Sequence, residues 1–318
     1  MTTNMKPEKK TNNLLKGIQP TLKEAKFMLT RLMKSPLSIA GLVLILYNVA
    51  LAVFAPLIAP PLPNADPYLI PRDQALGFFV EPSPPSATHL FGTSRLQVDM
   101  IYGCVWGTRF AFQLGLEIIA TTLTVGLILG MLAGYYGGFI DEVIMRFTDI
   151  ILAFPGLILA MAFVAVLARS GWPVINAAIL SIILIGWPGY TRLIRGEVLR
   201  VKGEDYVEAA RASGASDIRI MLRHILPNSI YSVIIVASLD FGSIVLTAAA
   251  LSFLGLGSSP GFADWGRLIY DGVPFASSGL KYWWAFVYPG IFIVLFTLGW
   301  NLMGDALRDV LDPLSRRR

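Results

Sequence analysis

The stretch Glu204–Asn228 reads EDYVEAARASGASDIRIMLRHILPN and predicts two short helices joined by a glycine-centred turn. Glycine accepts the left-handed backbone that ends helices, so Gly214 is expected to separate the two. Ser216 is a candidate N-cap for the second helix, and Asp217 falls in its first turn. The spacing of the apolar residues in the second helix predicts one buried face, made of Ile218, Met221, Leu222 and Ile225.

Polar residues keep this stretch from crossing a bilayer, although strongly apolar segments flank it on both sides. Arg219 and Arg223 fall on the side opposite the predicted apolar face. Pro227 is expected to close the element, because proline interrupts helices. The stretch is therefore expected to be a structured loop at which a membrane protein contacts its partners.

The composition predicts an all-α integral membrane protein. Hydrophobic residues make up 55% of the chain and charged residues 15%, and the mean hydropathy is +0.62. The apolar residues come in long blocks, which favours helices over the alternating pattern of a membrane barrel. The single cysteine, Cys104, allows no internal disulfide or cysteine metal site, and His89 and His224 are too far apart in sequence to indicate a metal site.

Six segments are long and apolar enough to span a membrane. They are Leu37–Ile58, Phe110–Tyr135, Val143–Ala168, Val174–Leu193, Ile230–Leu256 and Trp283–Met303. Pro155 and Pro188 are expected to kink the third and fourth. The chain is thus expected to consist of a tail (1–36), a first transmembrane helix (37–59), a proline-rich loop (60–107), a core domain with short helices at about 204–227 (108–308) and a second tail (309–318).

The distribution of positive charge predicts that both termini and the Glu204–Asn228 loop are cytosolic. With this orientation, all but six of the 26 lysines and arginines lie inside. The six outside are Arg72, Arg95, Arg109, Arg169, Arg267 and Lys281. The net charge of +5 follows from this anchoring at the lipid surface, and no nucleic-acid partner is expected.

Two further patterns leave alternatives open. The proline-rich loop is either a surface linker or a contact for whatever delivers substrate from outside. Small residues recur every four positions in the second span, at Thr122, Gly126, Gly130, Gly134 and Gly138. This spacing predicts close helix packing, either within the chain or across a dimer.

Two acids, Glu117 and Asp240, fall inside predicted spans. A charge in the hydrocarbon costs several kcal/mol unless it meets water or a partner. They are therefore candidates for a translocation pathway that accepts a cationic group, although a purely structural role is the alternative. The sequence carries no phosphate loop, HExxH, GxSxG or cysteine cluster, so passage or coupling is favoured over catalysis, and the chain is not expected to be an enzyme.

The central stretch resembles the EAA loop of binding-protein-dependent ABC importer permeases. The match rests on Glu208-Ala209-Ala210, on Gly214 six residues after the glutamate, and on Leu226-Pro227. The segments AGYYGGFIDEVIMRFTDIILAFP, GWPGYTRLIRGEVL, ALSFLGLG and GDALRDVLDP are similar to the C-type subunit of the dipeptide, oligopeptide and nickel group. The resemblance covers roughly His89 to Pro313 and the first span with its KSPLSIAG entry.

This resemblance implies a type I ABC importer permease fold with six transmembrane helices, in a prokaryotic inner or plasma membrane. It implies a homologous B-type permease as heterodimer partner, two cytosolic ATPase subunits and an extracytoplasmic substrate-binding protein. No cofactor or metal is expected on this chain, because ATP and Mg²⁺ would be held by the ATPases. The residues implied in ATPase coupling are Glu208, Ala209, Ala210, Arg211, Gly214, Asp217, Arg219, Arg223, Leu226 and Pro227.

One segment departs from the family pattern. Relatives show HPLGTD followed by GRD before the second span, where this chain has His89-Leu90-Phe91-Gly92-Thr93-Ser94-Arg95-Leu96-Gln97-Val98-Asp99. The resemblance predicts import of di- or oligopeptides, with oligosaccharides or nickel chelates as alternative substrates. A self-contained secondary carrier and a membrane receptor or scaffold that signals without transport are the readings from other classes.

Overall fold

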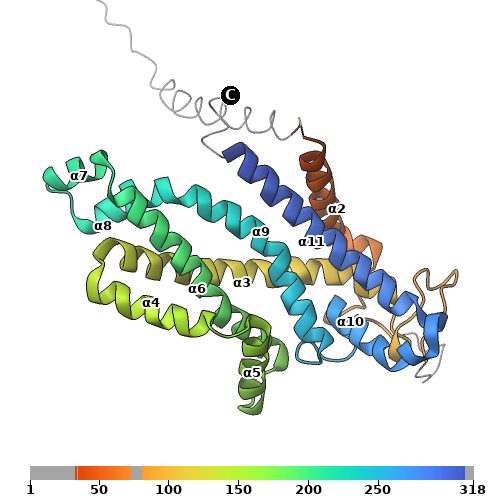
Figure 1. Cartoon of the computed structure of the whole chain (residues 1–318). Helices are drawn as coiled ribbons and strands as arrows, with labels where there is room; N and C mark the ends of the chain where they lie inside the picture. Colours follow the sequence, from red (N-terminus) through yellow and green to blue (C-terminus); the bar gives the residue numbers. More distant parts are fainter. Residues whose placement is uncertain (1–32, 34, 73–80, 312–318) are drawn as a thin grey trace, which may run out of the picture.

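Long apolar helices run through the computed structural model, which describes residues 33, 35–72 and 81–311 (Figure 1). Most of the expected tails, residues 1–36 and 309–318, therefore lies outside the described residues. Within the described part, five helical stretches are long and apolar enough to span a membrane. They contain α2 (Pro36–Ile58), α3 (Met100–Tyr136), α6 (Val174–Lys202), α9 (Leu226–Phe253) and α11 (Trp284–Leu311).

The expected third span is broken into two helices. In place of one helix over Val143–Ala168, α4 (Gly138–Leu152) and α5 (Gly156–Arg169) meet at 92°. Pro155 sits at this break as the N-cap of α5. Its ring removes a backbone donor and disfavours helical backbone at the residue before it, so the kink is a full break. Counted as one bent span, the pair gives the sixth crossing expected from the sequence.

Short elements connect the long helices. They are η2 (Arg95–Gln97), α7 (Asp205–Ala212), α8 (Asp217–Ile220), the π-helical turn η3 (Met221–Ile225), α10 (Trp265–Gly272) and η4 (Val273–Tyr282). The loop expected to end at residue 107 ends earlier, because α3 begins at Met100. Asp99 caps α3 by accepting a 2.8 Å hydrogen bond from the Tyr102 amide.

Helices α3 and α6 approach each other through the small-residue face of α3. A Cβ atom added at Gly126 would lie 2.4 Å from the Tyr190 Cβ, and one at Gly134 would lie 2.8 Å from the Val198 Cβ. The four-residue spacing therefore serves packing within the chain. Gly138 was wrongly included in it, because it begins α4 beyond the turn and has open space around it.

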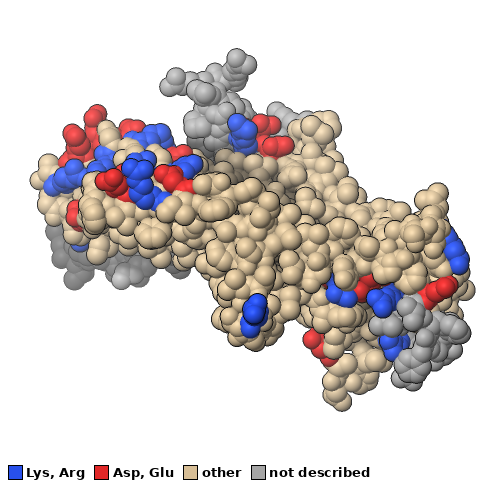
Figure 2. All heavy atoms as spheres, turned by 60° about the horizontal axis from the view of Figure 1, so that its bottom comes forward, with Lys and Arg blue, Asp and Glu red and all other residues tan. Residues whose placement is uncertain are grey.

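Most charged side chains gather at the two ends of the molecule, with a smaller group at the upper edge and a basic side chain at the lower edge of this view (Figure 2). One end carries α7 and α8, and the other carries α10 and the loops around it (Figure 1). We call these the α7–α8 end and the α10 end. The largely uncharged middle, where the long helices expose many large apolar side chains, suits a molecule that crosses a membrane with its helices running end to end.

Gly126→Ala should destabilise the chain by about 1–3 kcal/mol, because the new methyl group has no room against Tyr190. The matched control is Gly196→Ala on α6, where an added Cβ meets nothing within 4 Å. There alanine should be neutral or stabilising, since it favours helix over glycine. Thermal unfolding of the purified chain in detergent compares the two, and equal midpoints would contradict the packing described here.

Candidate functional site

The α7–α8 pair has the glycine turn expected from the sequence. Gly214 has φ of +79°, a left-handed conformation that other residues adopt at a cost. The Gly214 amide donates to the Arg211 carbonyl at 3.0 Å, and the Ala215 amide donates to the Ala210 carbonyl at 3.1 Å. These bonds satisfy carbonyls at the end of α7, so the turn has one defined geometry.

Apolar side chains anchor this pair on the long helices. Val207 of α7, Ile220 of α8 and Ile225 of η3 are fully buried. They belong to one cluster with Met131 of α3 and Val198 of α6. The short helices are therefore packed onto α3 and α6 as one unit and do not hang free in a loop.

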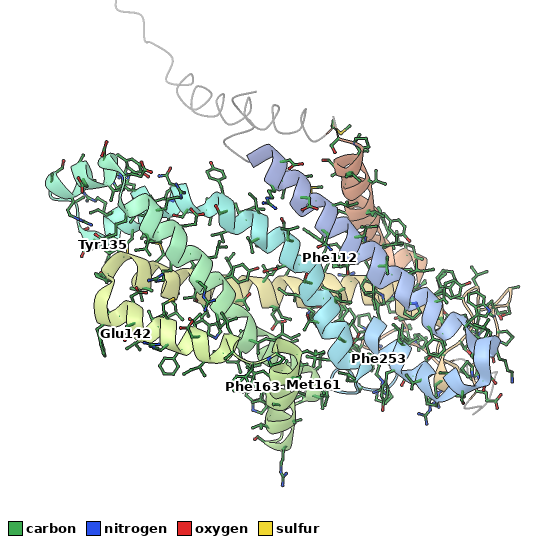
Figure 3. All side chains as sticks on the ribbon, in the orientation of Figure 1. Phe112, Tyr135, Glu142, Met161, Phe163 and Phe253 are labelled. Carbon is green, nitrogen blue, oxygen red and sulfur yellow. The ribbon has the colours of Figure 1, made fainter. Side chains whose placement is uncertain are left out.

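Tyr135, at the end of α3 next to α7 and α8, adds polar contacts to this anchor (Figure 3). Its hydroxyl donates to Asp217 Oδ1 at 2.6 Å. The Arg211 guanidinium lies 6.0 Å from the centre of its ring, and the Lys202 ammonium lies 5.5 Å from it. The Lys202 ammonium also donates to the Tyr135 carbonyl. One tyrosine thus joins α3, α6, α7 and α8.

The expected apolar face of the second helix is wrong in two of its four residues. Met221 and Ile225 are buried, whereas Ile218 is 65% exposed and Leu222 is 58% exposed. Ile220 takes their place in the core. The π-helical turn Met221–Ile225 adds a residue to the turn and rotates the residues after it, an effect that a regular 3.6-residue period does not anticipate.

Pro227 does not close the element, because α9 begins at Leu226 and continues to Phe253. A proline inside a helix lacks its amide donor and pushes away the carbonyl four residues earlier. The wide turn at Met221–Ile225 accommodates this ring. The Asn228 side-chain amide donates to the His224 carbonyl at 2.7 Å and supplies a further donor beside the proline.

The residues expected to couple to an ATPase form one accessible surface. Two of them, Ala210 and Leu226, are half-buried. The others are exposed: Glu208, Ala209, Arg211, Gly214, Asp217, Arg219, Arg223 and Pro227. A hollow on this surface is lined by Asp205, Glu208, Ala209, Arg211 and Ala212. Tyr206, Ile218 and Leu222 add exposed apolar area beside it. We call this set the α7–α8 surface.

The two acids of the spans lie in different places. Glu117 of α3 is exposed and lines a cavity of about 420 Å³ shared with α6, whereas Asp240 of α9 is half-buried and outside that cavity. The Asp240 carboxylate lies close enough to interact electrostatically with the Tyr190 hydroxyl of α6. That hydroxyl is buried and has no hydrogen-bond partner among the described residues. Among the described residues, no cluster of three or more His, Cys, Asp or Glu could hold a metal ion.

The α10 end holds a second polar cavity of about 350 Å³, which the sequence did not predict. Arg72, Arg95 and Arg267 line it together with Asp271, and we call it the arginine pocket. Arg267 pairs with Asp271 at 2.8 Å. Burial raises the pKa of the Asp271 carboxyl, and Arg267 and Arg95 counteract the rise. With three arginines around one acid, the pocket is suited to an anionic group.

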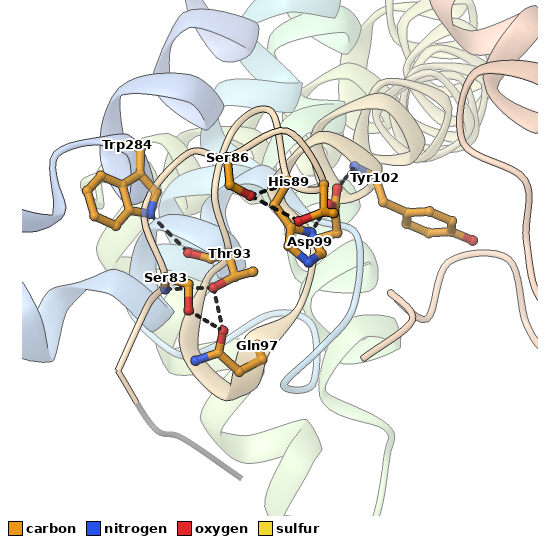
Figure 4. A network of polar contacts seen from close by, with 9 residues as sticks. Ser83, Ser86, His89, Thr93, Gln97, Asp99, Tyr102 and Trp284 are labelled. Carbon is orange, nitrogen blue, oxygen red and sulfur yellow. Dashed lines mark hydrogen bonds and ion pairs between the residues drawn. The ribbon is translucent and has the colours of Figure 1, made fainter. Parts of the chain in front are cut away.

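The segment that departs from the family pattern folds into a compact polar network (Figure 4). His89 Nδ1 lies 2.6 Å from Asp99 Oδ2. The Gln97 side-chain carbonyl accepts hydrogen bonds from the Ser83 and Thr93 hydroxyls, at 2.9 and 2.8 Å. The Trp284 indole donates to the Thr93 carbonyl at 3.1 Å. These contacts fix the loop onto α11, so the unusual sequence retains an ordered structure.

Comparison with known proteins gives consistent matches. A family model described as "Binding-protein-dependent transport system inner membrane component" matches residues 126–317. A second, described as "N-terminal TM domain of oligopeptide transport permease C", matches residues 26–78. The first range includes the whole α7–α8 surface, and Glu117 falls outside both.

Curated relatives cover most of the chain. The dipeptide transport system permease protein DppC of Alkalihalophilus pseudofirmus is 38% identical over 89% of this chain and 88% of its own length. The probable D,D-dipeptide transport system permease protein DdpC of Escherichia coli is 38% identical over 88% of both chains. The glutathione transport system permease protein GsiD of Pectobacterium atrosepticum is 39% identical over 77% of this chain and 80% of its own.

Among solved structures, the MetNI methionine ABC transporter in inward-facing conformations is similar in fold. It matches with a TM-score of 0.52 and 18% identity, over 67% of this chain and 98% of that chain. At this identity the likeness concerns the fold alone.

Tyr135→Phe should loosen the α7–α8 pair, because the hydroxyl that bonds Asp217 is lost. A hydrogen bond to a charged group contributes about 1.5–3 kcal/mol, and part of this is recovered by water at an exposed carboxylate. We expect amide hydrogen exchange over residues 205–220 to rise several-fold while exchange in α3 is unchanged. Tyr136→Phe is the matched control, since that ring is 46% exposed. Equal exchange in the two variants would show that Tyr135 is not an anchor.

Proposed function

The chain belongs to the family of binding-protein-dependent transport system inner membrane components, and from this premise we propose that it couples a peptide pathway to cytosolic ATPases. As a member of that family it is a multi-pass inner-membrane transport subunit and not an enzyme. The observation that carries the proposal is the α7–α8 surface, which is exposed on one side and anchored to two long helices on the other.

The partners in this proposal are a homologous B-type permease, two ATPase subunits and an extracytoplasmic substrate-binding protein. ATP and Mg²⁺ belong to the ATPases. Lysines and arginines are more numerous around the α7–α8 end than around the α10 end, which supports a cytosolic position for the α7–α8 end, with the α10 end outside. The energy of ATP binding would then reach this chain only through contact with an ATPase.

The α7–α8 surface has the chemistry of a docking site. Glu208 and Arg211 offer opposite charges at the edge of the hollow, and the small side chain of Ala209 permits close approach. Ile218 and Leu222 are exposed apolar side chains at this charged end of the molecule. They give a partner protein apolar area to cover. Closure of the ATPases would push this unit and, through Tyr135 and Val207, move α3 and α6.

Peptides are the favoured substrates. The relatives reported above are named for dipeptides, D,D-dipeptides and glutathione, and this supports a peptide over an oligosaccharide or a nickel chelate. The same relatives favour a subunit of an ATP-driven importer over a self-contained secondary carrier.

The arginine pocket at the α10 end is suited to receive an acidic side chain of the substrate-binding protein.

Glu208→Arg and Gly214→Pro should each lower peptide uptake and coupled ATP hydrolysis at least about tenfold in the assembled transporter. The first replaces a negative charge in the hollow with a positive one. A partner group that pairs with Glu208 would then meet a like charge, and like charges placed together across an interface cost several kcal/mol. The second forces φ to about −65° where the turn needs +79°. Glu142→Arg is the control, since this acid at the same end lies on α4 and is exposed (Figure 3).

The measurements are subunit stoichiometry of the purified complex, uptake into proteoliposomes and ATP hydrolysis stimulated by the binding protein. Wild-type uptake in both α7–α8 variants, with normal stoichiometry, would exclude this surface from coupling. Loss in the Glu142→Arg control as well would point to a general charge effect at this end.

Asp240→Asn tests a pathway role for the second acid. If Asp240 meets cationic groups in transit, uptake of a lysine-containing peptide should fall about tenfold relative to an uncharged one. Asp305→Asn on α11 is the control, because this acid is exposed at the end of the helix. A ratio of the two uptakes equal to the wild-type ratio would assign Asp240 a structural role beside Tyr190.

A further inference from the structure

One face of α3 is polar where a membrane-spanning helix would be expected to be apolar. Arg109, Gln113 and Glu117 follow each other at four-residue intervals, which places them on one side of the helix. All three are exposed, whereas Leu114 and Ile118 on another face are buried. Glu117 lies near the midpoint of the 37-residue helix. Lipid is a costly neighbour for such charges, so this face requires water or a polar partner.

The charges on this face are not neutralised within the described part of the chain. Glu117 pairs with no basic side chain there, and Arg109 pairs with no acid. The Arg109 guanidinium lies 5.5 Å from the centre of the Trp106 ring. It also interacts electrostatically with the Tyr68 hydroxyl. Neither contact supplies a negative charge. The helix therefore presents an isolated anion and an isolated cation about two turns apart.

A cavity meets the inner part of this face. Glu117 and Gln113 line the cavity of about 420 Å³, which is within the size range of small-ligand sites. The amide of Asn176 on α6 also lines this cavity. The aromatic rings of Phe110, Trp172 and Phe262 form much of the remaining lining. Carboxylate beside aromatic rings is the surrounding that an ammonium group favours.

Gln113 is held in place between the two charges. Its side-chain carbonyl accepts a 2.8 Å hydrogen bond from the Tyr68 hydroxyl. This bond fixes the orientation of the side-chain amide, whose nitrogen keeps its two donors for another group. The Gln113 amide thus offers a hydrogen-bond donor between Arg109 and Glu117. The carbonyl oxygen of a bound peptide bond could accept this hydrogen bond.

We propose that Arg109, Gln113 and Glu117 hold a short peptide by its two termini during passage, with the ammonium group at Glu117 and the carboxylate at Arg109. The inference rests on the proposed function of the chain as part of a peptide importer. Eight residues of helix separate the two charges by about 12 Å along the axis. An extended chain covers about 3.3–3.6 Å per residue, so with two long side chains reaching inward the site fits peptides of about two to four residues.

The site reads features that short peptides share. Dipeptides, D,D-dipeptides and glutathione, for which the relatives are named, differ in side chains and stereochemistry but all carry an ammonium group and a carboxylate. Because Glu117 lies deeper along α3 than Arg109 when approached from the α10 end, the peptide travels amino terminus first.

The test uses the complete transporter in proteoliposomes, with its binding protein and a labelled unmodified tripeptide without charged side chains. Glu117→Gln and Arg109→Gln should each lower uptake about tenfold, the loss expected for one charged contact. Binding-protein-stimulated ATP hydrolysis should persist in both. Thr121→Val is the control, since that hydroxyl is already bonded to the Glu117 carbonyl of its own helix at 2.8 Å and lies outside the cavity.

Charge reversal gives the sharper comparison. Glu117→Arg leaves two cations on the face and Arg109→Glu leaves two anions, so either change alone should abolish uptake. The double variant restores one charge of each sign, in reversed order, and should recover uptake several-fold above both single variants.

Four results would overturn the proposal: wild-type uptake in the glutamine variants, a double variant no better than the single ones, an equal loss in Thr121→Val, or ATP hydrolysis lost together with uptake. Failure of the proposed function is a separate result, because the wild-type complex would then take up no peptide at all.

Discussion

The close approach of α3 and α6 is the constraint on which the α7–α8 end of the molecule depends. Gly126, Gly130 and Gly134 let the backbones meet at distances that a single methyl group would prevent. Within a bilayer, lipid is as apolar as leucine, so helix association depends on such surface fit and on polar contacts. Arg195 adds a bidentate pair with Asp141, at 2.5 and 2.6 Å, which ties α4 to α6. The four-residue spacing thus creates the platform on which the α7–α8 surface rests.

This platform holds a short, polar helix pair rigidly, as the proposed coupling role requires. Eight-residue and four-residue helices are not stable alone, since nucleation is costly and few hydrogen bonds repay it. Val207 and Ile220 supply buried contacts, and Tyr135 fixes Asp217 at the start of α8. In the proposed mechanism, force applied to the exposed side reaches α3 and α6 because the buried side is packed tightly against both helices.

Much of this organisation could be predicted from the sequence, and the misses have local physical causes. Five spans, the glycine turn at Gly214 and the close packing of α3 follow from hydropathy, backbone freedom and small-residue spacing. The break at Pro155 was foreseen as a kink, but the angle depends on neighbours that sequence periodicity does not include. Leu222 lies within the π-helical turn, which has no periodic signature, whereas Ile218 lies before the turn, in α8.

The candidate sites divide in the same way. Exposure of Glu208 and its neighbours agrees with the loop expected from sequence, whereas the tyrosine anchor joins positions 82 residues apart and leaves no local pattern. Glu117 stood out as an acid in an apolar span, but Gln113 and Arg109 were not joined to it. Their four-residue spacing was the available signal. The arginine pocket brings together residues of a loop, of η2 and of α10 that are far apart in sequence, so only the folded chain reveals it.

Helix α3 connects the two regions of interest mechanically. Glu117 and Tyr135 lie 18 residues apart on it, about 27 Å along the axis. No proline interrupts α3, whereas α6 contains Pro188 and the stretch leading into α9 contains a π-helical turn beside Pro227. A tilt imposed at Tyr135 is therefore carried to Glu117 by an unbroken helix, while α6 and α9 have places to bend. In the proposed importer, the helix that bears the peptide-binding face would move as a rod against more compliant neighbours.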